Sequence, residues 1–276
     1  DSDWNETMRY GVKALDYYAK ALKIDPNLFE VYKYISPIHS LLGNPELHFK
    51  AEDDYFTTQK LVAEKHQLQK LKIRFIEKDQ LKSTIGNIGH LDGYIKAGLL
   101  GSDDKVTNIL LLKPGERHTF PNPHILEYLD KYIKIIDDEC SFNLLSKFEK
   151  YLQVNVAGPF NYEGKILSAH SVMSLTQKRW VDDKREPLFK LSEIDLERGW
   201  GTLGKLGMPK DSWFVCLHIR ESGGSKGDDP FREAKISDYY PALKAITDLG
   251  GWVIRMGDPS MTAIDDMENV VDYIHT

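Results

Sequence analysis

The sequence predicts an α/β protein that begins with a purely helical segment. Residues 10–71 carry apolar side chains at the spacing of helices and show no strand-like alternation. Beyond residue 71, short apolar runs alternate with helical segments, which is typical of a largely parallel sheet covered by helices. The 276 residues allow about two domains at roughly 150 residues each. A mainly disordered chain is excluded, because 41% of the residues are hydrophobic.

The N-terminal segment is predicted to form two helices and then a third. The first two meet at Asp25-Pro26-Asn27, with Pro26 expected in the first turn of the second helix, and a third helix is expected over 45–71. The pair at 11–42 resembles one tetratricopeptide repeat (TPR), through the string ALKIDPN at 21–27 and the helix-ending Gly43-Asn44. An ordinary helical hairpin is the alternative. Either way, such a unit needs a neighbour to bury its apolar face, and we expect it on the next domain or on further repeats.

The middle of the chain is predicted to alternate strands and helices. The expected elements are a strand at 72–76, a glycine-bearing loop at 85–90, a helix at 91–99, a strand at 106–112, a helix from Asn122-Pro123 to Ile133, and a helix through Leu144 and Tyr151. The stretch that follows, up to residue 190, predicts no definite order of elements.

The last part of the chain contains the clearest pattern. Ser192 and Asp195 form an acidic variant of a capping box, opening a helix that runs to Gly207. A buried strand at 213–219, a helix capped by Ser237 and ending at Gly250-Gly251, a strand at 252–256 and a further strand from 270 are then expected. This order predicts a parallel strand–helix–strand unit.

Charge and cysteine content narrow the functional classes. The net charge is −6 and the basic residues are scattered, which disfavours a general binder of nucleic acid or anionic membranes. Cys140 and Cys216 lie far apart and are expected to be buried free thiols of a reducing compartment. No apolar run approaches the ~18 residues of a membrane span. We therefore expect a cytoplasmic location, with peripheral attachment at the inner membrane as a variant.

Candidate ligand-binding residues follow the strand at 213–219. His218 and Arg220 are expected on one face at its carboxyl end, where open α/β sheets bind ligands, and Gly223-Gly224 follow. A guanidinium beside an imidazole and a glycine loop suits a phosphate or pyrophosphate. In the alternative, Arg220 pairs with Glu221 or Asp258, and His218 is a core residue.

Two further loops carry candidate residues. Arg255, Gly257 and Asp258 end the next strand and are expected to share the anion site, with a plain turn as the alternative. Gly86-Asn87-Ile88-Gly89-His90 precedes a helix, where free amides favour an anion or a sugar hydroxyl, and His90 is a candidate general base. The dinucleotide fingerprint, the P-loop and metal-binding spacings are missing from the sequence.

Several strings resemble a bacterial family of glycosyltransferases associated with surface-polysaccharide gene clusters. They are IGNIGHL (85–91), NPH (122–124), FVCLHIRE (214–221) and GGWVIRMGDPSM (250–261), and the resemblance covers about two thirds of the chain. The His-x-Arg element is also similar to that of fucosyltransferase-like enzymes of the GT-B type, which have two Rossmann-like domains. Those enzymes commonly place a second arginine where Glu221 stands, so a fucose donor is not expected.

The resemblance implies a metal-independent enzyme that moves a sugar from a nucleotide-sugar donor to a glycan or lipid-linked acceptor, with no cofactor. Residues 1–71 would be the TPR-like segment, 72–190 the acceptor-side domain and 191–276 the start of an incomplete donor-side domain. Arg220 would bind the donor pyrophosphate beside His218, with Gly223, Gly224, Arg255, Gly257 and Asp258 around it. Gly86, Asn87, Gly89 and His90 would form the acceptor loop.

Two further expectations concern completeness and catalysis. Residues 191–276 leave room for only about three strands, so the sequence is expected to be a fragment that binds donor weakly. The competing prediction is a non-catalytic adapter that binds a protein partner through its N-terminal helices. That prediction depends on the repeat-like start of the chain and on the lack of an assignable acid/base pair.

Overall fold

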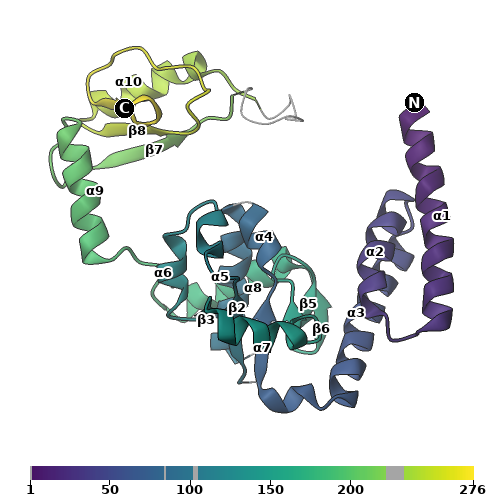
Figure 1. Cartoon of the computed structure of the whole chain (residues 1–276). Helices are drawn as coiled ribbons and strands as arrows, with labels where there is room; N and C mark the ends of the chain where they lie inside the picture. Colours follow the sequence, from purple (N-terminus) through teal and green to yellow (C-terminus); the bar gives the residue numbers. More distant parts are fainter. Residues whose placement is uncertain (1, 84, 102–104, 222–232) are drawn as a thin grey trace. The chain divides into compact units, whose positions relative to one another are not determined.

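The structure is a computed structural model that describes residues 2–83, 85–101, 105–221 and 233–276 (Figure 1). The chain forms two compact units, Asp1–Phe189 and Lys190–Thr276, and each is described by itself. Both are mixtures of helices and parallel strands, so the predicted α/β class is confirmed.

The first unit begins with the predicted helices. They are α1 (Ser2–Ile24), η1 (Phe29–Val31), α2 (Tyr32–Leu41) and α3 (Pro45–Lys65), followed by η2 (Leu68–Leu71). Gly43 has a φ of 71°, the left-handed conformation that commonly ends a helix. Pro26 lies in the turn before η1 and not in a helical first turn, which corrects the prediction. Pro45 instead takes the first position of α3, where its missing N–H costs no helical hydrogen bond.

These helices pack on the α/β part of the same unit, as expected. Phe29, Tyr55 and Val62 form a small core, and Tyr151, two residues before Gln153 of the sheet, packs against it. The buried Gln59 amide of α3 donates to the backbone oxygens of Lys150 (3.1 Å) and Gln153 (3.2 Å). A buried amide with such partners fixes α3 beside the edge of the sheet.

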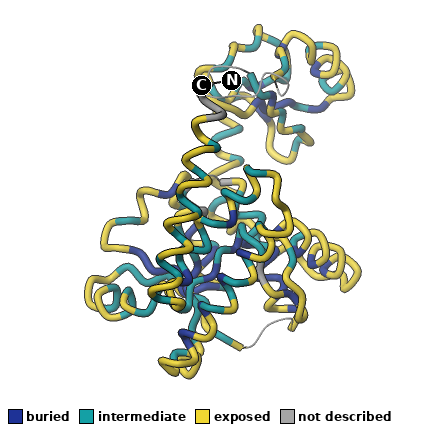
Figure 2. Tube along the Cα trace, turned by 90° about the vertical axis from the view of Figure 1, so that its right-hand side faces the viewer, coloured by how far each residue is buried: buried dark blue, intermediate teal, exposed yellow. Residues whose placement is uncertain are grey.

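The sheet of the first unit has four parallel strands in the order β3-β2-β1-β4. They are β1 (Ile73–Ile76), β2 (Thr107–Leu111), β3 (Lys134–Ile136) and β4 (Gln153–Val154). Because side chains alternate along a strand, Phe75 and Leu111 face one layer of helices, while Ile76 and Leu110 face another. The buried residues of the chain concentrate in these strands and the helices on them (Figure 2).

Helices cover both faces of this sheet. The elements around it are α4 (Lys78–Ser83), η3 (Ile85–Asn87), α5 (Ile88–Leu99), η4 (Glu116–Thr119), α6 (Ile125–Leu129), α7 (Glu139–Glu149), the antiparallel hairpin β5 (Phe160–Tyr162) and β6 (Lys165–Leu167), and α8 (Ala169–Asp182). α7 covers the face of Phe75, whereas α5 and α8 cover the face of Ile76. A Cβ at Gly93 of α5 would lie 2.9 Å from the Met173 Cα of α8, so these two helices are in close contact.

Three predictions for the middle region were wrong. The helix after Asn122-Pro123 ends at Leu129, because Ile133 enters the core and leads into β3. Strands β3 and β4 were missed, since two or three residues are too few to show an alternating pattern. Residues 85–90 form η3 and the first turn of α5, not a loop.

The second unit contains the predicted parallel strand–helix–strand unit. Its elements are α9 (Glu193–Lys205), β7 (Phe214–His218), η6 (Ile236–Tyr239), α10 (Tyr240–Asp248), β8 (Trp252–Met256), β9 (Val270–Asp272) and η7 (Tyr273–His275), with the sheet order β7-β8-β9. The Ser192 hydroxyl accepts from the Asp195 amide at 3.1 Å, which confirms the capping box.

Three details of this unit differ from expectation. Ser237 lies inside η6, and Tyr239 is the residue before α10. Strand β7 is not buried: Phe214 is 39% exposed, and Cys216 on the same face is exposed too. Cys140 is also exposed, so neither cysteine is the buried thiol that was predicted. β7 is an edge strand, and the apolar run alone could not distinguish it from a central one.

Candidate functional site

Two histidines meet where α5 and α8 begin. α5 follows β1 and runs back to the start of β2, so its first turn lies at the carboxyl edge of the parallel sheet. His90 is the third residue of α5, and His170 is the second residue of α8. Their Nε2 atoms are 3.4 Å apart, and their rings meet edge to face with the ring centroids 4.7 Å apart. The carboxyl edge is the usual ligand-binding edge of open α/β sheets.

The surroundings of His90 favour its neutral form. Partial burial, and secondly the neighbouring His170, lower the pKa of His90 from its usual 6.5. The N-terminal end of α5 acts in the same direction, because its dipole disfavours a nearby positive charge. The buried Nδ1 atom of His90 has no hydrogen-bond partner among the described residues. A neutral imidazole at pH 7 is the form that can accept a proton.

The predicted acceptor loop forms the turn that leads into His90. Gly86 and Asn87 lie in η3, and Asn87 is the residue before α5. A Cβ at Gly89 would lie 3.5 Å from the Met173 sulfur, an ordinary contact distance, so this glycine faces α8. These residues therefore place His90 against α8. Sequence reasoning missed His170, which is 80 residues away; its one local signal is Ser168, which caps α8.

A charged cluster lies near the ends of β1 and β2. Glu116 accepts hydrogen bonds from Lys78 (3.0 Å), from the Lys113 amide (2.6 Å) and from Lys82. Partial burial opposes ionisation of Glu116, but these hydrogen bonds lower its pKa to about 2. Sequence reasoning did not single out this cluster, although Lys78 and Lys82 are four residues apart on one helix. The carboxyl edge thus carries two lysines and a firmly ionised carboxylate.

In the second unit, Glu221 organises the segment after β7. Its Oε1 accepts from the Ile236 amide at 3.1 Å, and its Oε2 accepts from Arg255 Nη2 (2.8 Å) and from the Thr262 amide (2.9 Å). The Arg255 side chain is fully buried, and its Nη1 also lies 3.5 Å from Asp272 Oδ1. Glu221 is therefore the partner of Arg255.

Strand register explains why Arg255 differs from the prediction. Arg255 is paired with Leu217 and Asp272, whereas His218 is paired with Met256. Paired residues point to the same side of a sheet, so Arg255 lies on the face opposite His218. Its guanidinium connects strands and loops inside the unit, whereas an accessible position beside His218 was expected.

The remaining predicted residues of this edge have separate environments. His218 is exposed at the end of β7, and Arg220 is half-buried just beyond it, with its carbonyl accepting from the Ala234 amide at 2.9 Å. Gly223 and Gly224 lie outside the described residues. The structure thus places His218 and Arg220 near the end of β7, and the glycine loop that follows lies outside the described residues.

Gly257 and Asp258 form a turn after β8. The Asp258 carboxylate accepts from the Ser260 amide at 2.9 Å, and hydrogen bonding to Ser260 lowers the pKa of Asp258. A Cβ at Gly257 would lie 2.5 Å from the Met261 sulfur, so the glycine lets Met261 fold back on the turn. Both observations correspond to the plain-turn alternative.

Within the described residues, no group of three or more His, Cys, Asp or Glu side chains is arranged to hold a metal ion. None of the helices there combines the length and the apolarity needed to cross a membrane. Comparison of the chain with protein-family models, with curated proteins and with solved structures finds no match.

Proposed function

We propose that the chain belongs to a glycosyltransferase that moves a sugar from a nucleotide-sugar donor to a glycan or lipid-linked acceptor without a metal ion. The observation that carries the proposal is the placement of His90, half-buried beside His170 at the carboxyl edge of a parallel sheet. The resemblance of the strings around His90 and Arg220 to such enzymes supports it. The first unit would bind the acceptor, and the second would bind the donor.

On the acceptor side, His90 would take the proton of the attacking hydroxyl. Its lowered pKa keeps the imidazole unprotonated near pH 7, and His170 is within hydrogen-bonding distance to hold its ring. Because Nδ1 of His90 is buried, its Nε2 is the atom that would take the proton, with the acceptor hydroxyl replacing His170 as the partner of that nitrogen. Proton uptake by this pair would raise the nucleophilicity of the acceptor oxygen as the bond to the sugar forms.

On the donor side, Arg220 would stabilise the negative charge that develops on the departing nucleoside diphosphate. Glu221 is the next residue, and its contacts with Ile236, Arg255 and Thr262 hold the backbone after β7 in place. A fixed cation aimed at developing charge contributes ~2–4 kcal/mol to transition-state stabilisation in comparable sites. His218 would lie beside the diphosphate.

Nucleotide binding tests this proposal. We expect at least one nucleoside diphosphate of a panel (UDP, GDP, ADP and dTDP) to bind the chain. We expect Arg220→Ala to weaken both that binding and the transfer reaction. Arg198→Ala is the matched control. The side chain of this α9 arginine is 70% exposed, and among the described ion pairs it contacts only Asp195, three residues away. Equal binding and equal transfer in Arg220→Ala and the unsubstituted chain would contradict the donor-site assignment.

A second candidate function is that of an adapter that binds a protein through its N-terminal helices. The observation that favours it is the number of exposed apolar side chains on α1, where Tyr10, Val12 and Tyr17 are 55%, 57% and 58% exposed. A thermal-shift panel of nucleoside diphosphates and nucleotide-sugars separates the two functions. A ligand at 100 times its Kd adds about 2.7 kcal/mol to the free energy of unfolding. No response across the panel would favour the adapter.

A further inference from the structure

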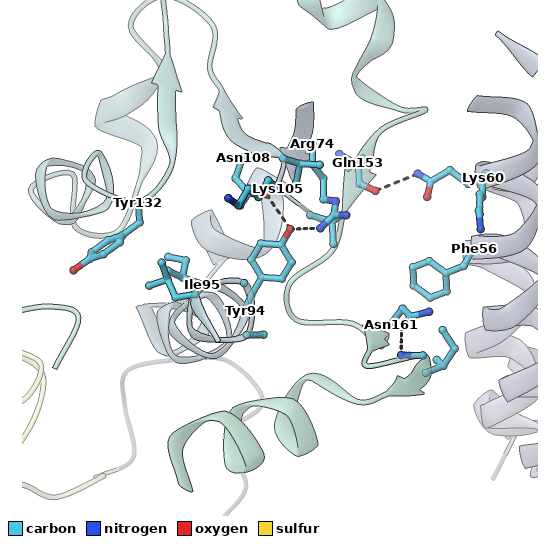
Figure 3. A pocket seen from close by; sticks show the side chains of 18 of the residues that line it. Phe56, Lys60, Arg74, Tyr94, Ile95, Lys105, Asn108, Tyr132, Gln153 and Asn161 are labelled. Atoms are coloured by element: carbon cyan, nitrogen blue, oxygen red, sulfur yellow. Dashed lines mark hydrogen bonds between the residues drawn. The ribbon is translucent and has the colours of Figure 1, made fainter. Parts of the chain in front are cut away.

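A cavity of about 740 Å³ lies at the amino edge of the four-stranded sheet, between the sheet and α3 (Figure 3). Arg74 of β1, Asn108 of β2 and Tyr132, just before β3, line it near the starts of their strands. Phe56 and Lys60 of α3 contribute from the opposite side. His90 is at the other edge of the same sheet, so this cavity is separate from the proposed catalytic edge.

The cavity contains a fixed polar centre. Tyr94 of α5 is 5% exposed, and its hydroxyl accepts from Arg74 Nη1 at 2.8 Å and donates to Asn108 Oδ1 at 2.9 Å (Figure 3). Gln153 and Asn161 also line the cavity; the Gln153 side chain accepts from Lys33 Nζ at 3.2 Å and the Asn161 side chain from the Gly164 amide at 2.9 Å. Planar amides and a tyrosine hydroxyl offer donors and acceptors in fixed directions, as the hydroxyl groups of a sugar require.

Aromatic side chains add apolar surface to these polar groups. Phe56 and Tyr132 both line the cavity and are half-buried; the Tyr132 hydroxyl donates to the Leu188 carbonyl at 2.7 Å, and its ring meets Phe189 edge to face. The apolar face of a sugar ring packs on such a surface while its hydroxyl groups reach the amides. A cavity of this size with mixed polar and aromatic walls accommodates a short oligosaccharide.

The charge of the lining is strongly positive, although the whole chain carries −6. Among the described residues, four cationic side chains and one carboxylate, that of Asp53, line the cavity; the cations are Lys60, Arg74, Lys105 and Lys131. They come from α3, from β1, from the segment before β2 and from the segment before β3, so the positive charges surround the cavity. This distribution suits a ligand that carries several separated negative charges.

A single phosphate group fits this arrangement less well. α5 lines the cavity with Ala97, Gly98 and Leu99 at its carboxyl-terminal end, where the helix dipole is negative. Phosphate sites in α/β proteins instead use the amino-terminal end of a helix. Carboxylates spaced along a sugar chain can instead lie beside the separated cations and away from this helix end, while the sugar rings contact the polar and aromatic walls.

We propose that this cavity binds an acidic oligosaccharide whose successive sugars carry carboxylate groups. The inference goes beyond the proposed transfer reaction and does not depend on it, because it uses neither His90 nor any residue of the second unit. Binding at this site would hold an acidic glycan on the first unit whether or not the chain transfers sugars.

Titration calorimetry with hexagalacturonic acid tests the proposal on the full 276-residue chain, with neutral maltohexaose as the uncharged comparison. We expect the acid to bind and its affinity to fall as salt rises, because ions screen exposed charges. The double variant Lys60→Ala with Lys131→Ala should raise the Kd by about tenfold, as expected for the loss of two charge contacts at ~0.7 kcal/mol each. Both lysines are exposed, so the variant is expected to fold normally.

The matched control removes two exposed lysines of α1, Lys13→Ala with Lys23→Ala, and should change the Kd by less than about twofold. Four outcomes would overturn the proposal: no binding of the acid to the unsubstituted chain, an equal loss in both double variants, equal binding of maltohexaose, or displacement of the acid by inorganic phosphate at the same concentration of charge. None of these measurements uses a nucleotide, so their failure is distinct from failure of the transferase proposal.

Discussion

The carboxyl edges of the two parallel sheets hold their ionisable groups in different ways. In the first unit, His90 and His170 are partly accessible, contact each other and depend on the packing of two helices. In the second, Arg255 is fully buried and bound by Glu221 and Asp272. A buried, paired charge chiefly determines structure, whereas an accessible imidazole with a lowered pKa can do chemistry. At equivalent strand ends, therefore, Arg255 is a structural residue, and His90 is a candidate for a reactive one.

The largest expected effect comes from breaking the buried pair. Arg255→Ala leaves Glu221 buried without its main cationic partner, so we expect the second unit to lose about 3–5 kcal/mol of unfolding free energy. Hydrogen exchange of the amides of β8, measured in the whole chain, reports on that unit. Arg198→Ala, at an exposed pair, should change protection by less than about 0.5 kcal/mol. If both variants changed the protection of β8 by a similarly small amount, Arg255 would not have the structural role assigned to it.

An intermediate effect is expected where α5 meets α8. Gly93→Ala places a methyl group 2.9 Å from the backbone of Met173, which cannot move as a flexible side-chain end could, so we expect a loss of about 1–3 kcal/mol. Gly98→Ala is the control on the same helix, because no atom lies within 4 Å of its added Cβ. This change should be neutral or stabilise by up to about 1 kcal/mol. Urea denaturation of the two variants checks the contrast, which fails if Gly93→Ala is as stable as Gly98→Ala.

The sequence predicted those features that depend on neighbours along the chain. The Ser192 cap, the helix end at Gly43 and the parallel pairing of β7 with β8 follow from local residue types and from connection length. It could not predict contacts that need register or distant packing. Arg255 resembles an anion ligand until strand pairing places it on the face opposite His218, and nothing in the local sequence connects His90 with His170.

The cavity was missed for the same reason. Its lining is assembled from α3, α5, the four strands of the sheet or the residues just before them, and the β5–β6 hairpin. Each basic side chain looks like a solvated surface charge within its own segment. The docking of α3, to which Gln59 contributes, forms one wall of this space. Hydrophobic periodicity predicts that α3 exists and which face it buries, but it does not predict the element on which that face packs.

The smallest expected effect concerns the pKa of His90. His170→Ala removes the neighbouring imidazole, so the pKa of His90 should rise toward 6.5, while its burial, the larger cause of the shift, remains. The folded pKa of His90 lies below its unfolded value of about 6.5. The contribution of His90 to stability is therefore complete above that pH and is lost as the pH falls through the folded pKa. In His170→Ala that loss should be smaller. Titration of His90 by NMR measures the shift, with the exposed His118→Ala as control. An unchanged or lower pKa of His90 in His170→Ala would mean that the two imidazoles are not coupled, and His90 would then act without a partner.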